Sequence, residues 1–331
     1  MSAPLVLTQG DPAGIGPELA LHAWTARSGR AIPPFIAAIH PALLRETARR
    51  LNLTVPIVVV APEEAASAFP TGLPVLDGME GVSVEPGRPD PATARSTLTS
   101  IDCAVALVRA GRASAVVTNP IAKSVLYAAG FAHPGHTEYL GVLAERLWGE
   151  PVRPVMMLWS TVLAVVPVTI HIALAQVPAA LTEDLIVETA RIVARDLTAR
   201  FGLPRPRMAF AGLNPHAGED GAIGTEEISV VRPAIARLAA EGFDVRGPLP
   251  ADTMFHPQAR ARYDVALCMY HDQALIPIKT LAFDDGVNVT LGLPFVRTSP
   301  DHGTAFDIAG KGIARPDSLL AALDLAGRIA G

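Results

Sequence analysis

Short apolar runs alternate with helical patterns along almost the whole chain, and this alternation restricts the fold more than any other feature of the sequence. The runs consist largely of Val, Ile, Leu and Ala, as is typical of strands buried on both faces. They are Leu5–Thr8, Phe35–Ile39, Ile57–Val60, Ala115–Thr118, Val155–Leu158, Leu163–Thr169, Met208–Ala211, Val265–Met269 and Val287–Leu291. Buried strands separated by helices predict an α/β fold with a largely parallel sheet.

Start and stop signals mark several of the helices between these runs. Thr182, followed by two acidic residues, predicts a helix N-terminus, and Gly202 predicts the end of the same helix. A second helix is expected to begin in Thr225-Glu-Glu and to end at Gly242, and the last one to begin at Pro316.

Composition and charge exclude several classes of protein. Half of the 331 residues are hydrophobic and 18% are charged, which allows a large core in one large or two medium domains. The net charge is −5 and no block of Lys and Arg occurs, so we expect neither a nucleic-acid nor a membrane partner. Cys103 and Cys268 form no CxxC pair, which argues against a disulfide framework and a thiolate zinc site.

We expect a cytoplasmic protein. The first residues, MSAPLVLTQGDPAG, lack the basic start and the apolar core of a signal peptide. The segment from Pro154 to Thr182 contains no Asp, Glu, Lys or Arg and is long enough to span a bilayer. Because Pro167, Pro178 and His171 interrupt it, we expect two buried strands near a site instead.

In open α/β folds, ligands bind beyond the carboxyl ends of the strands, so the residues that follow each strand are candidates for a site. The first strand is followed by GDPAGIGPE (10–18), whose glycines allow tight turns and whose Pro17 suits the first turn of a helix. This motif either binds an anion or simply joins the strand to the helix. It does not match G-x-G-x-x-G, so the ordinary Rossmann fingerprint is missing.

Two polar clusters suit a small anionic ligand. His136 and Thr137 are adjacent in a turn with a glycine, and they form either a ligand-binding pair or an exposed turn with a capping Thr. Lys279, Asn288 and Arg297 could surround a phosphate or carboxylate, and their apolar neighbours argue against a merely solvated face.

Three histidines stand where predicted strands end. They are His171 in VTIHIAL, His216 in GLNPHAGEDG and His271 in MYHDQALIPIK. A lone histidine is usually a core or surface residue with satisfied hydrogen bonds, and this alternative stays open for each of them. Three of them, with Glu219 and Asp272 nearby, also fit a catalytic site in which neutral imidazoles bind a divalent metal.

Together these motifs resemble the 4-hydroxythreonine-4-phosphate dehydrogenase family of pyridoxal phosphate biosynthesis. The matching blocks lie in order between residues 8 and 312 and are GDPAGIGPE, TNPIAK, PGHTEYL, GLNPHAGEDGAIGTEE, ADTMF, YDVALCMYHDQALIPIK and GVNVTLGLPFVRTSPDHGTAFDIAGKG. The last block is also similar to the nucleotide loop of isopropylmalate and isocitrate dehydrogenases, which bind NAD(P) without a Rossmann fingerprint. Gln9 stands where the family is expected to have proline.

The resemblance implies a two-domain α/β fold of the isocitrate/isopropylmalate dehydrogenase type, with largely parallel sheets and an interdomain cleft. We place the nucleotide-side domain at residues 1–125 and 285–331, and the metal, substrate and dimerisation domain at 126–284. The resemblance also implies a homodimer in which both subunits contribute metal ligands to each active site.

Roles for individual residues follow from the same resemblance. The implied metal ligands are His171, His216 and His271, and the implied substrate contacts are His136, Thr137, Lys279, Asn288 and Arg297. The glycine-rich stretch expected to bind the cofactor includes Ser299, His302, Gly303, Thr304, Asp307 and Gly310. Asp252 or Asp272 is expected to accept a proton or to orient its acceptor, and Lys279 is a further catalytic candidate.

The implied reaction is the oxidation of the 3-hydroxyl of 4-phosphooxy-L-threonine by NAD, with NADP as a possible substitute. The product, 2-amino-3-oxo-4-phosphooxybutanoate, would lose carbon dioxide to give 3-amino-2-oxopropyl phosphate. A divalent metal would lower the pKa of the hydroxyl, and imidazole ligands favour Zn, Co or Ni over Mg.

Rival functions remain open. Sister enzymes oxidise 4-phosphorylated threonate or erythronate, or a terephthalate-derived cis-diol, and the His136-Thr137-Glu138 block argues only against the diol. Phosphate acyltransferases share a related fold but need neither NAD nor metal, so they would leave three strand-end histidines without a use. A non-catalytic binding protein would not need buried polar residues of this variety.

Overall fold

The computed structural model describes residues 3–331, and the chain divides into two compact units. The first unit runs to Pro154 and resumes at Leu293–Gly331, and the second unit is Val155–Gly292. Both boundaries lie C-terminal to the positions that the sequence analysis uses, 125/126 and 284/285. The segment that begins at His136 therefore belongs to the first unit.

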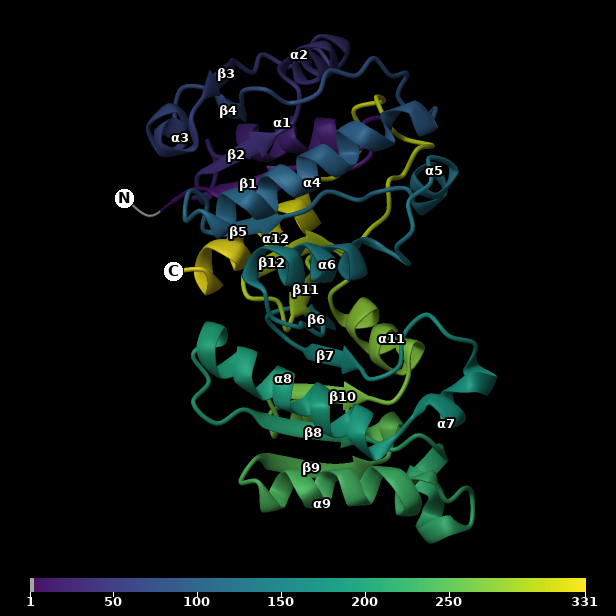
Figure 1. The fold of residues 1–331 in the computed structure, drawn as a ribbon. Helices are drawn as coiled ribbons and strands as arrows, with labels where there is room; N and C mark the ends of the chain where they lie inside the picture. Colours follow the sequence, from purple (N-terminus) through teal and green to yellow (C-terminus); the bar gives the residue numbers. More distant parts are fainter. Residues whose placement is uncertain (1–2) are drawn as a thin grey trace. The chain divides into compact units, whose positions relative to one another are not determined.

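The first unit is built on a parallel sheet whose strand order is β3-β4-β2-β1-β5-β12. Its strands are β1 (Leu5–Thr8), β2 (Phe35–Ala38), β3 (Ile57–Val60), β4 (Leu73–Leu76), β5 (Ala115–Val117) and β12 (Val296–Pro300). Its helices are α1 (Gly16–Ala26), α2 (Pro41–Arg50), α3 (Ala65–Ala68), α4 (Ala94–Arg109), α5 (Lys123–Ala128), α6 (His136–Trp148) and α12 (Asp317–Ile329). Helices α4, α6 and α12 are shown beside these strands in Figure 1.

The second unit has a mixed sheet with the strand order β11-β6-β7-β10-β8-β9. The pairs from β7 to β9 are parallel, whereas β6 runs antiparallel to both of its neighbours. Its strands are β6 (Val155–Trp159), β7 (Ala164–Pro167), β8 (Arg207–Ala211), β9 (Asp244–Leu249), β10 (Val265–Cys268) and β11 (Val287–Leu291). Its helices are α7 (Val177–Ala180), α8 (Glu183–Phe201), α9 (Arg232–Ala240), α10 (Pro257–Arg260) and α11 (His271–Leu281). Three short segments, η4 (Pro215–Gly221), η5 (Glu227–Val231) and η6 (Ala251–Thr253), lie between them.

The predicted α/β class with largely parallel sheets is confirmed. All nine predicted strands are present, with shifts of a residue or two at some ends. The long helix after Thr182 begins as expected, because the Thr182 hydroxyl accepts a hydrogen bond from the Leu185 amide (3.1 Å), and Gly202 ends it in the left-handed conformation. The uncharged stretch from Pro154 forms β6 and β7, and no helix in the described part of the chain is long and apolar enough to cross a membrane.

Three strands were not predicted, and each has a physical reason. β9 contains Gly247 and Pro248, which a strand tolerates at the edge of a sheet. β4 contains Pro74, and because a proline argues against a central strand, its sequence suggests a loop. β12 has the sequence VRTSP, and all five residues are buried although three of them are polar. Polar residues in a buried strand obscure the apolar signal.

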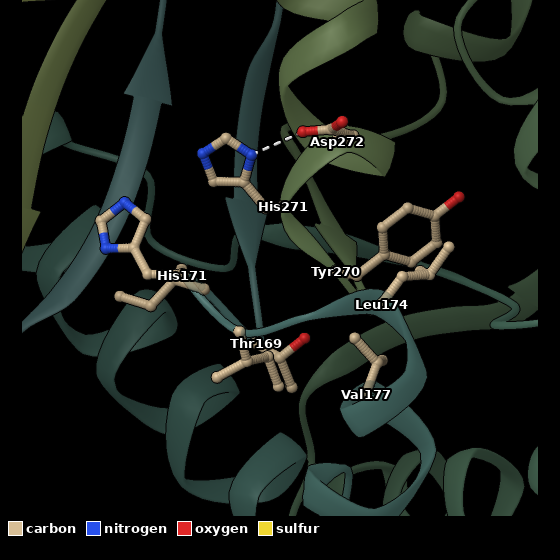
Figure 2. Close-up of a pocket in the computed structure, with 9 residues that line it drawn as sticks. Thr169, His171, Leu174, Val177, Tyr270, His271 and Asp272 are labelled. Atoms are coloured by element: carbon tan, nitrogen blue, oxygen red, sulfur yellow. Dashed lines mark hydrogen bonds and ion pairs between the residues drawn. The ribbon is translucent and has the colours of Figure 1, made fainter.

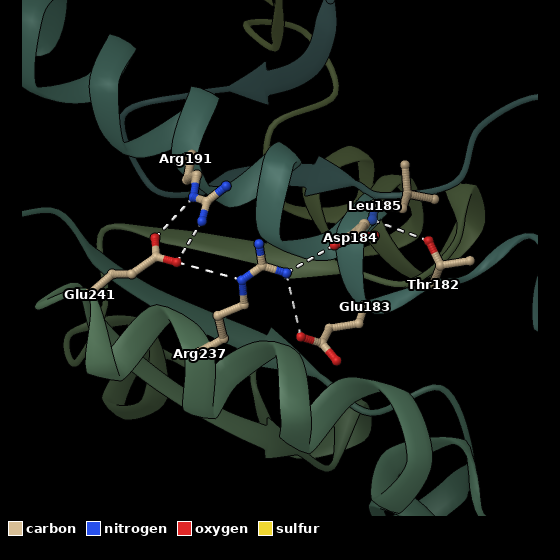
Figure 3. Close-up of polar contacts among 7 residues, drawn as sticks. All are labelled: Thr182, Glu183, Asp184, Leu185, Arg191, Arg237 and Glu241. Atoms are coloured by element: carbon tan, nitrogen blue, oxygen red, sulfur yellow. Dashed lines mark hydrogen bonds and ion pairs between the residues drawn. The ribbon is translucent and has the colours of Figure 1, made fainter.

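A surface ion-pair network joins α8 and α9, which pack side by side (Figures 1 and 3). Arg191 binds both oxygens of Glu241 (2.9 and 2.5 Å), and Arg237 binds Asp184 (2.9 Å). Because these side chains are partly exposed, each pair contributes only about 0.2–1 kcal/mol to folding. The network helps to hold the two helices together on the surface.

Candidate active site

Three neighbouring parallel strands of the second unit lead to the three predicted metal ligands. In the order β7-β10-β8, the strands are followed by His171, His271 and His216, respectively. Because the carboxyl ends of parallel strands meet at one edge of a sheet, the topology places all three histidines at that edge. The next strand, β9, leads to η6, which carries Asp252.

His171 and His271 lie together (Figure 2). A side-chain hydrogen bond also joins their two segments, in addition to the pairing of the strands: the Thr169 hydroxyl donates to the Met269 carbonyl (2.7 Å). The two ring centroids are 5.7 Å apart. Two imidazoles that share one zinc through nitrogens at about 2.0–2.1 Å have centroids no more than about 6.5 Å apart, so the pair fits a common metal.

Asp272 supports one of these rings from the side away from His171 (Figure 2). Its Oδ1 lies 2.7 Å from Nδ1 of His271. A carboxylate in this place favours the tautomer with the proton on Nδ1 and leaves Nε2 with a lone pair, the arrangement common among metal-binding histidines. The Asp272 side chain is itself largely exposed.

Gln273 holds two of the strand ends in place. Its Oε1 accepts a hydrogen bond from the Met269 amide at the end of β10 (2.7 Å), and its Nε2 donates to the Gly212 carbonyl that follows β8 (2.7 Å). The polar run MYHDQ therefore combines a potential ligand, its carboxylate partner and a buried amide that joins two strands.

His216 stands on a left-handed turn. The residues from 216 to 220 all have positive φ, between 42° and 78°, and only Gly218 among them is a glycine. An L-residue in this conformation costs roughly 1–2 kcal/mol, so the four others together cost on the order of 4–8 kcal/mol. Strain of this size persists only where the surrounding structure enforces it, and it is commonest at functional sites.

The left-handed turn does not bring His216 to the other two histidines. It packs against η5, η6 and β9, which lie on the side of the sheet away from β7. The described residues contain no group of three or more His, Cys, Asp or Glu side chains that could hold a metal ion. Within one chain the structure thus offers a pair of imidazoles and, apart from it, a third that is exposed to solvent.

The other predicted residues of the second unit lie on three different elements. Lys279 is near the end of α11, with its Nζ 5.9 Å from the centre of the Phe283 ring. Asn288 is in β11 opposite Leu158, and its Oδ1 is buried without a hydrogen-bond partner among the described residues. Asp252 is exposed on η6, beside the turn of His216.

In the first unit, Arg297 is the central cation. It lies in β12 and is 4% exposed, and the Thr118 hydroxyl accepts from its Nε (3.1 Å) and Nη2 (2.7 Å). Burial lowers the pKa of Arg297 to about 10, so the guanidinium is still charged at neutral pH. A buried cation of this kind is suited to bind an anionic group of a ligand.

His136 and Thr137 begin α6 in the same unit. The Nε2 of His136 is buried and has no hydrogen-bond partner among the described residues. Burial, followed by the charge of Arg297, holds the pKa of His136 well below its usual value of 6.5. A neutral imidazole near a cation can donate or accept a hydrogen bond with a ligand at neutral pH.

GDPAGIGPE supports the glycine-rich stretch. The Ile15 amide donates to the Thr304 carbonyl (3.0 Å), and the buried Glu18 accepts from the Gly310 amide (2.7 Å). A side chain at Gly14 would come within 2.9 Å of the same Thr304 carbonyl, which explains the glycine. The motif thus connects β1 to α1 and also fixes the stretch from Ser299 to Gly312.

That stretch carries all of the predicted cofactor residues. The ring of His302 contacts the Gly303 carbonyl through Nδ1 (2.9 Å), while its Nε2 is buried and lacks a partner in the described structure. Asp307 is exposed. Gly303 has no atom within 4 Å of the place where a Cβ would stand, so a ligand can approach its backbone.

The model of the family described as "Pyridoxal phosphate biosynthetic protein PdxA" matches residues 31–326 of the chain. The chain belongs to this family. A PdxA-family relative from Methylorubrum extorquens, named 4-hydroxythreonine-4-phosphate dehydrogenase, is 64% identical over 99% of this chain and 94% of its own length.

Solved structures agree with the PdxA assignment. A 4-hydroxythreonine-4-phosphate dehydrogenase from Klebsiella pneumoniae superposes with a TM-score of 0.87 and 37% identity, covering 100% of both chains. A terephthalate 1,2-cis-dihydrodiol dehydrogenase from Burkholderia xenovorans is less similar, with a TM-score of 0.65 and 28% identity over 98% of each chain. The predicted family is confirmed.

Three residues that shape the candidate site lie in the matching blocks but were given no role from the sequence. Thr118, Gln273 and Glu227 are buried polar side chains next to predicted site residues. Thr118 ends a predicted strand and Gln273 directly follows Asp272, so their polarity at a strand end was the available signal. The role of Glu227 has no such signal, because its contacts depend on an unusual turn.

Proposed function

We propose that the protein oxidises the 3-hydroxyl of 4-phosphooxy-L-threonine with NAD, as a step in pyridoxal 5′-phosphate biosynthesis. Hydride leaves C3 for the nicotinamide, the hydroxyl proton goes to a base, and 2-amino-3-oxo-4-phosphooxybutanoate and NADH are formed. This β-keto acid then loses carbon dioxide to give 3-amino-2-oxopropyl phosphate. The observation that carries the proposal is the name of a relative 64% identical over 99% of the chain.

The histidines fit a divalent metal. Their donor set consists of imidazole nitrogens, which favour Zn, Co or Ni, while Mg prefers oxygen ligands. The spacing of His171 and His271 suits a shared ion, and Asp272 supports His271 as outer carboxylates commonly do. When bound, such an ion supplies a lowered pKa for the substrate hydroxyl and polarisation of the ketone.

The third ligand is proposed to come from a second copy of the chain. One chain presents His171 and His271 as a pair and keeps His216 apart from them. Both segments carry exposed apolar side chains, Ile172 and Leu174 beside the pair and Ile223 in the loop that follows the His216 turn. Apolar side chains clustered beside polar ligands are typical of a surface that a partner covers. In this homodimer, His216 would complete the metal site of the partner subunit.

The remaining candidates divide by charge. Arg297 and Lys279 would neutralise the phosphate and carboxylate of the substrate, and His136, Thr137 and Asn288 would donate or accept hydrogen bonds. Arg297 carries most of this role, because it is buried and still charged. Asp252 and Asp272 are the carboxylates available as proton acceptor, and Lys279 is the third candidate.

The stretch from Ser299 to Gly312 is proposed to hold NAD, or NADP in its place. Its open glycine and its buried, unpartnered histidine nitrogen suit a polar ligand with flat rings. Ser299, His302, Gly303, Thr304, Asp307 and Gly310 would line this site. The support from Glu18 and Ile15 keeps the stretch ordered before the cofactor arrives.

A substrate panel tests the proposal against its rivals. The purified protein is assayed with NAD and Zn²⁺ against 4-phosphooxy-L-threonine, 4-phosphothreonate, 4-phosphoerythronate and the terephthalate cis-diol, and against acyl-CoA with phosphate. We expect the highest kcat/KM with 4-phosphooxy-L-threonine. A higher value with threonate or erythronate would reassign the substrate, and acyl transfer without NAD reduction would reassign the reaction.

A further inference from the structure

The left-handed turn that carries His216 rests on a buried carboxylate. Glu227, at the start of η5, is 1% exposed, and no cation pairs with it among the residues that the structure describes. Its two oxygens instead accept hydrogen bonds from a single residue, Asn214, which directly precedes the turn. The Asn214 amide donates to Oε1 (2.7 Å), and its side-chain Nδ2 donates to Oε2 (3.0 Å) and also to Oε2 of the neighbouring Glu226 (2.8 Å).

The same carboxylate lies against the backbone at two points of the chain around His216. A Cβ on Gly212, where the chain leaves β8, would stand 3.1 Å from Oε1 of Glu227. A Cβ on Gly218, in the middle of the turn, would stand 2.6 Å from Oε2. The carboxylate therefore occupies the space that closes the turn against the strand.

This contact also connects His216 to the rest of the sheet edge. The Gly212 carbonyl accepts the hydrogen bond from Gln273, which is two residues after His271. A continuous set of contacts thus runs from the helix of His271 through Gly212 and Glu227 to the turn of His216. A strained backbone conformation persists only where its surroundings enforce it. We therefore expect the left-handed turn to depend on this carboxylate.

We propose that Glu227 is a positioning residue, whose buried carboxylate keeps the turn Pro215–Gly221 left-handed and so presents the His216 imidazole to a divalent metal. The inference rests on the proposed function, in which His216 is a metal ligand. Glu227 touches neither substrate nor metal in this account and acts only through the turn. A carboxylate is required because both groups directed at it are donors, and an amide would oppose one of them with its own N–H.

The test is a titration of the metal-free protein with Co²⁺, followed by its absorption bands and by calorimetry. Glu227→Gln should weaken Co²⁺ binding about tenfold to a hundredfold, as is usual when an outer partner of a metal ligand is lost. Asn214→Ala keeps the backbone hydrogen bond and should weaken binding less, in the same direction. In a His216→Ala background, Glu227→Gln should have no further effect on Co²⁺ affinity.

The matched control is Asp196→Asn. Asp196 is also a buried carboxylate of the second unit, 2% exposed, but it accepts from the Gly292 amide (2.7 Å) and pairs with arginines of α8. Its substitution should lower the unfolding temperature without changing Co²⁺ affinity. Equal losses of affinity in Glu227→Gln and Asp196→Asn would overturn the inference, because the effect would then be general destabilisation.

The outcomes separate this inference from the proposed function. If His216→Ala loses Co²⁺ while Glu227→Gln binds it as tightly as the wild type, the positioning role is wrong and the metal site stands. If His216→Ala itself binds Co²⁺ like the wild type, the metal site of the proposed function is wrong.

Discussion

Both units gather candidate site residues toward the carboxyl ends of their strands, but the two sets are suited to ligands of opposite charge. In the first unit, the edge carries the buried cation Arg297, the neutral His136 and a glycine-rich stretch, all suited to anionic or flat groups. In the second unit, the corresponding edge carries His171, His271 and carboxylates, which suit a cation. The same kind of parallel sheet can thus support an anion-binding or a cation-binding site, and the side chains near the strand ends decide which of the two it is.

Burial acts differently on the two groups of the first unit. It lowers the pKa of both Arg297 and His136, since both lose solvation when charged. The pKa of Arg297 starts from 12.5 and falls to about 10, so the charge survives at neutral pH. The pKa of His136 starts from 6.5, so the same cause makes this ring neutral. Of these two groups, only Arg297 therefore carries a positive charge at neutral pH.

The largest expected effect is on the second unit. His271→Ala should abolish turnover and bound metal while retaining the wild-type unfolding profile, because one imidazole fewer leaves too few ligands for a tight divalent site. Metal content by elemental analysis and an unfolding curve measure the two properties. A variant that keeps both its metal and its activity would remove His271 from the site.

Mixing inactive variants tests which ligands come from which subunit. If one chain supplies His171 and His271 and the partner supplies His216, a heterodimer of His216→Ala with His271→Ala has one complete site and should recover activity. A heterodimer of His171→Ala with His271→Ala has none and should stay inactive. The opposite pattern, with heterodimers shown to form, would contradict the pairing seen in the structure.

A smaller effect is expected in the first unit. Arg297→Ala should raise the KM for the phosphorylated substrate about tenfold to a hundredfold, because a charge-assisted hydrogen bond is worth about 1.5–3 kcal/mol. Arg297→Lys should recover only part of this loss, since a planar fork becomes a point charge. Steady-state kinetics measure both, and the surface variant Arg237→Ala serves as the control with an unchanged KM. Wild-type kinetics in Arg297→Ala would place this residue outside the site.

The smallest expected effect is a pH dependence of stability. The pKa of His136 is lower in the folded than in the unfolded state, so the unfolded chain takes up this proton first as the pH falls. Its contribution to stability is complete above about pH 6.5, the ordinary value, and is lost as the pH falls below it. His136→Gln should flatten the decline of unfolding temperature in that range, whereas the exposed His256→Gln should keep it. Identical profiles for all three proteins would show that His136 is not buried as described.

Much of the fold could be predicted because apolar runs report burial directly. Strand β12 was not predicted because it lacks such an apolar run: Arg297, Thr298 and Ser299 are buried but polar. Polar candidates at the strand ends could also be predicted, because ligands bind at this end of the strands in α/β folds. The separation of His216 from the other imidazoles could not, because it depends on a left-handed turn held by contacts with residues distant in the sequence, among them Glu227.

The contrast between an anion-binding and a cation-binding edge is tested most directly by removing the metal. The wild-type protein is stripped with a chelator, dialysed and assayed with 4-phosphooxy-L-threonine and NAD before and after Zn²⁺ is added back. The account predicts no NADH formation by the stripped protein and recovery of turnover when Zn²⁺ is restored. Full turnover by the metal-stripped protein would contradict it.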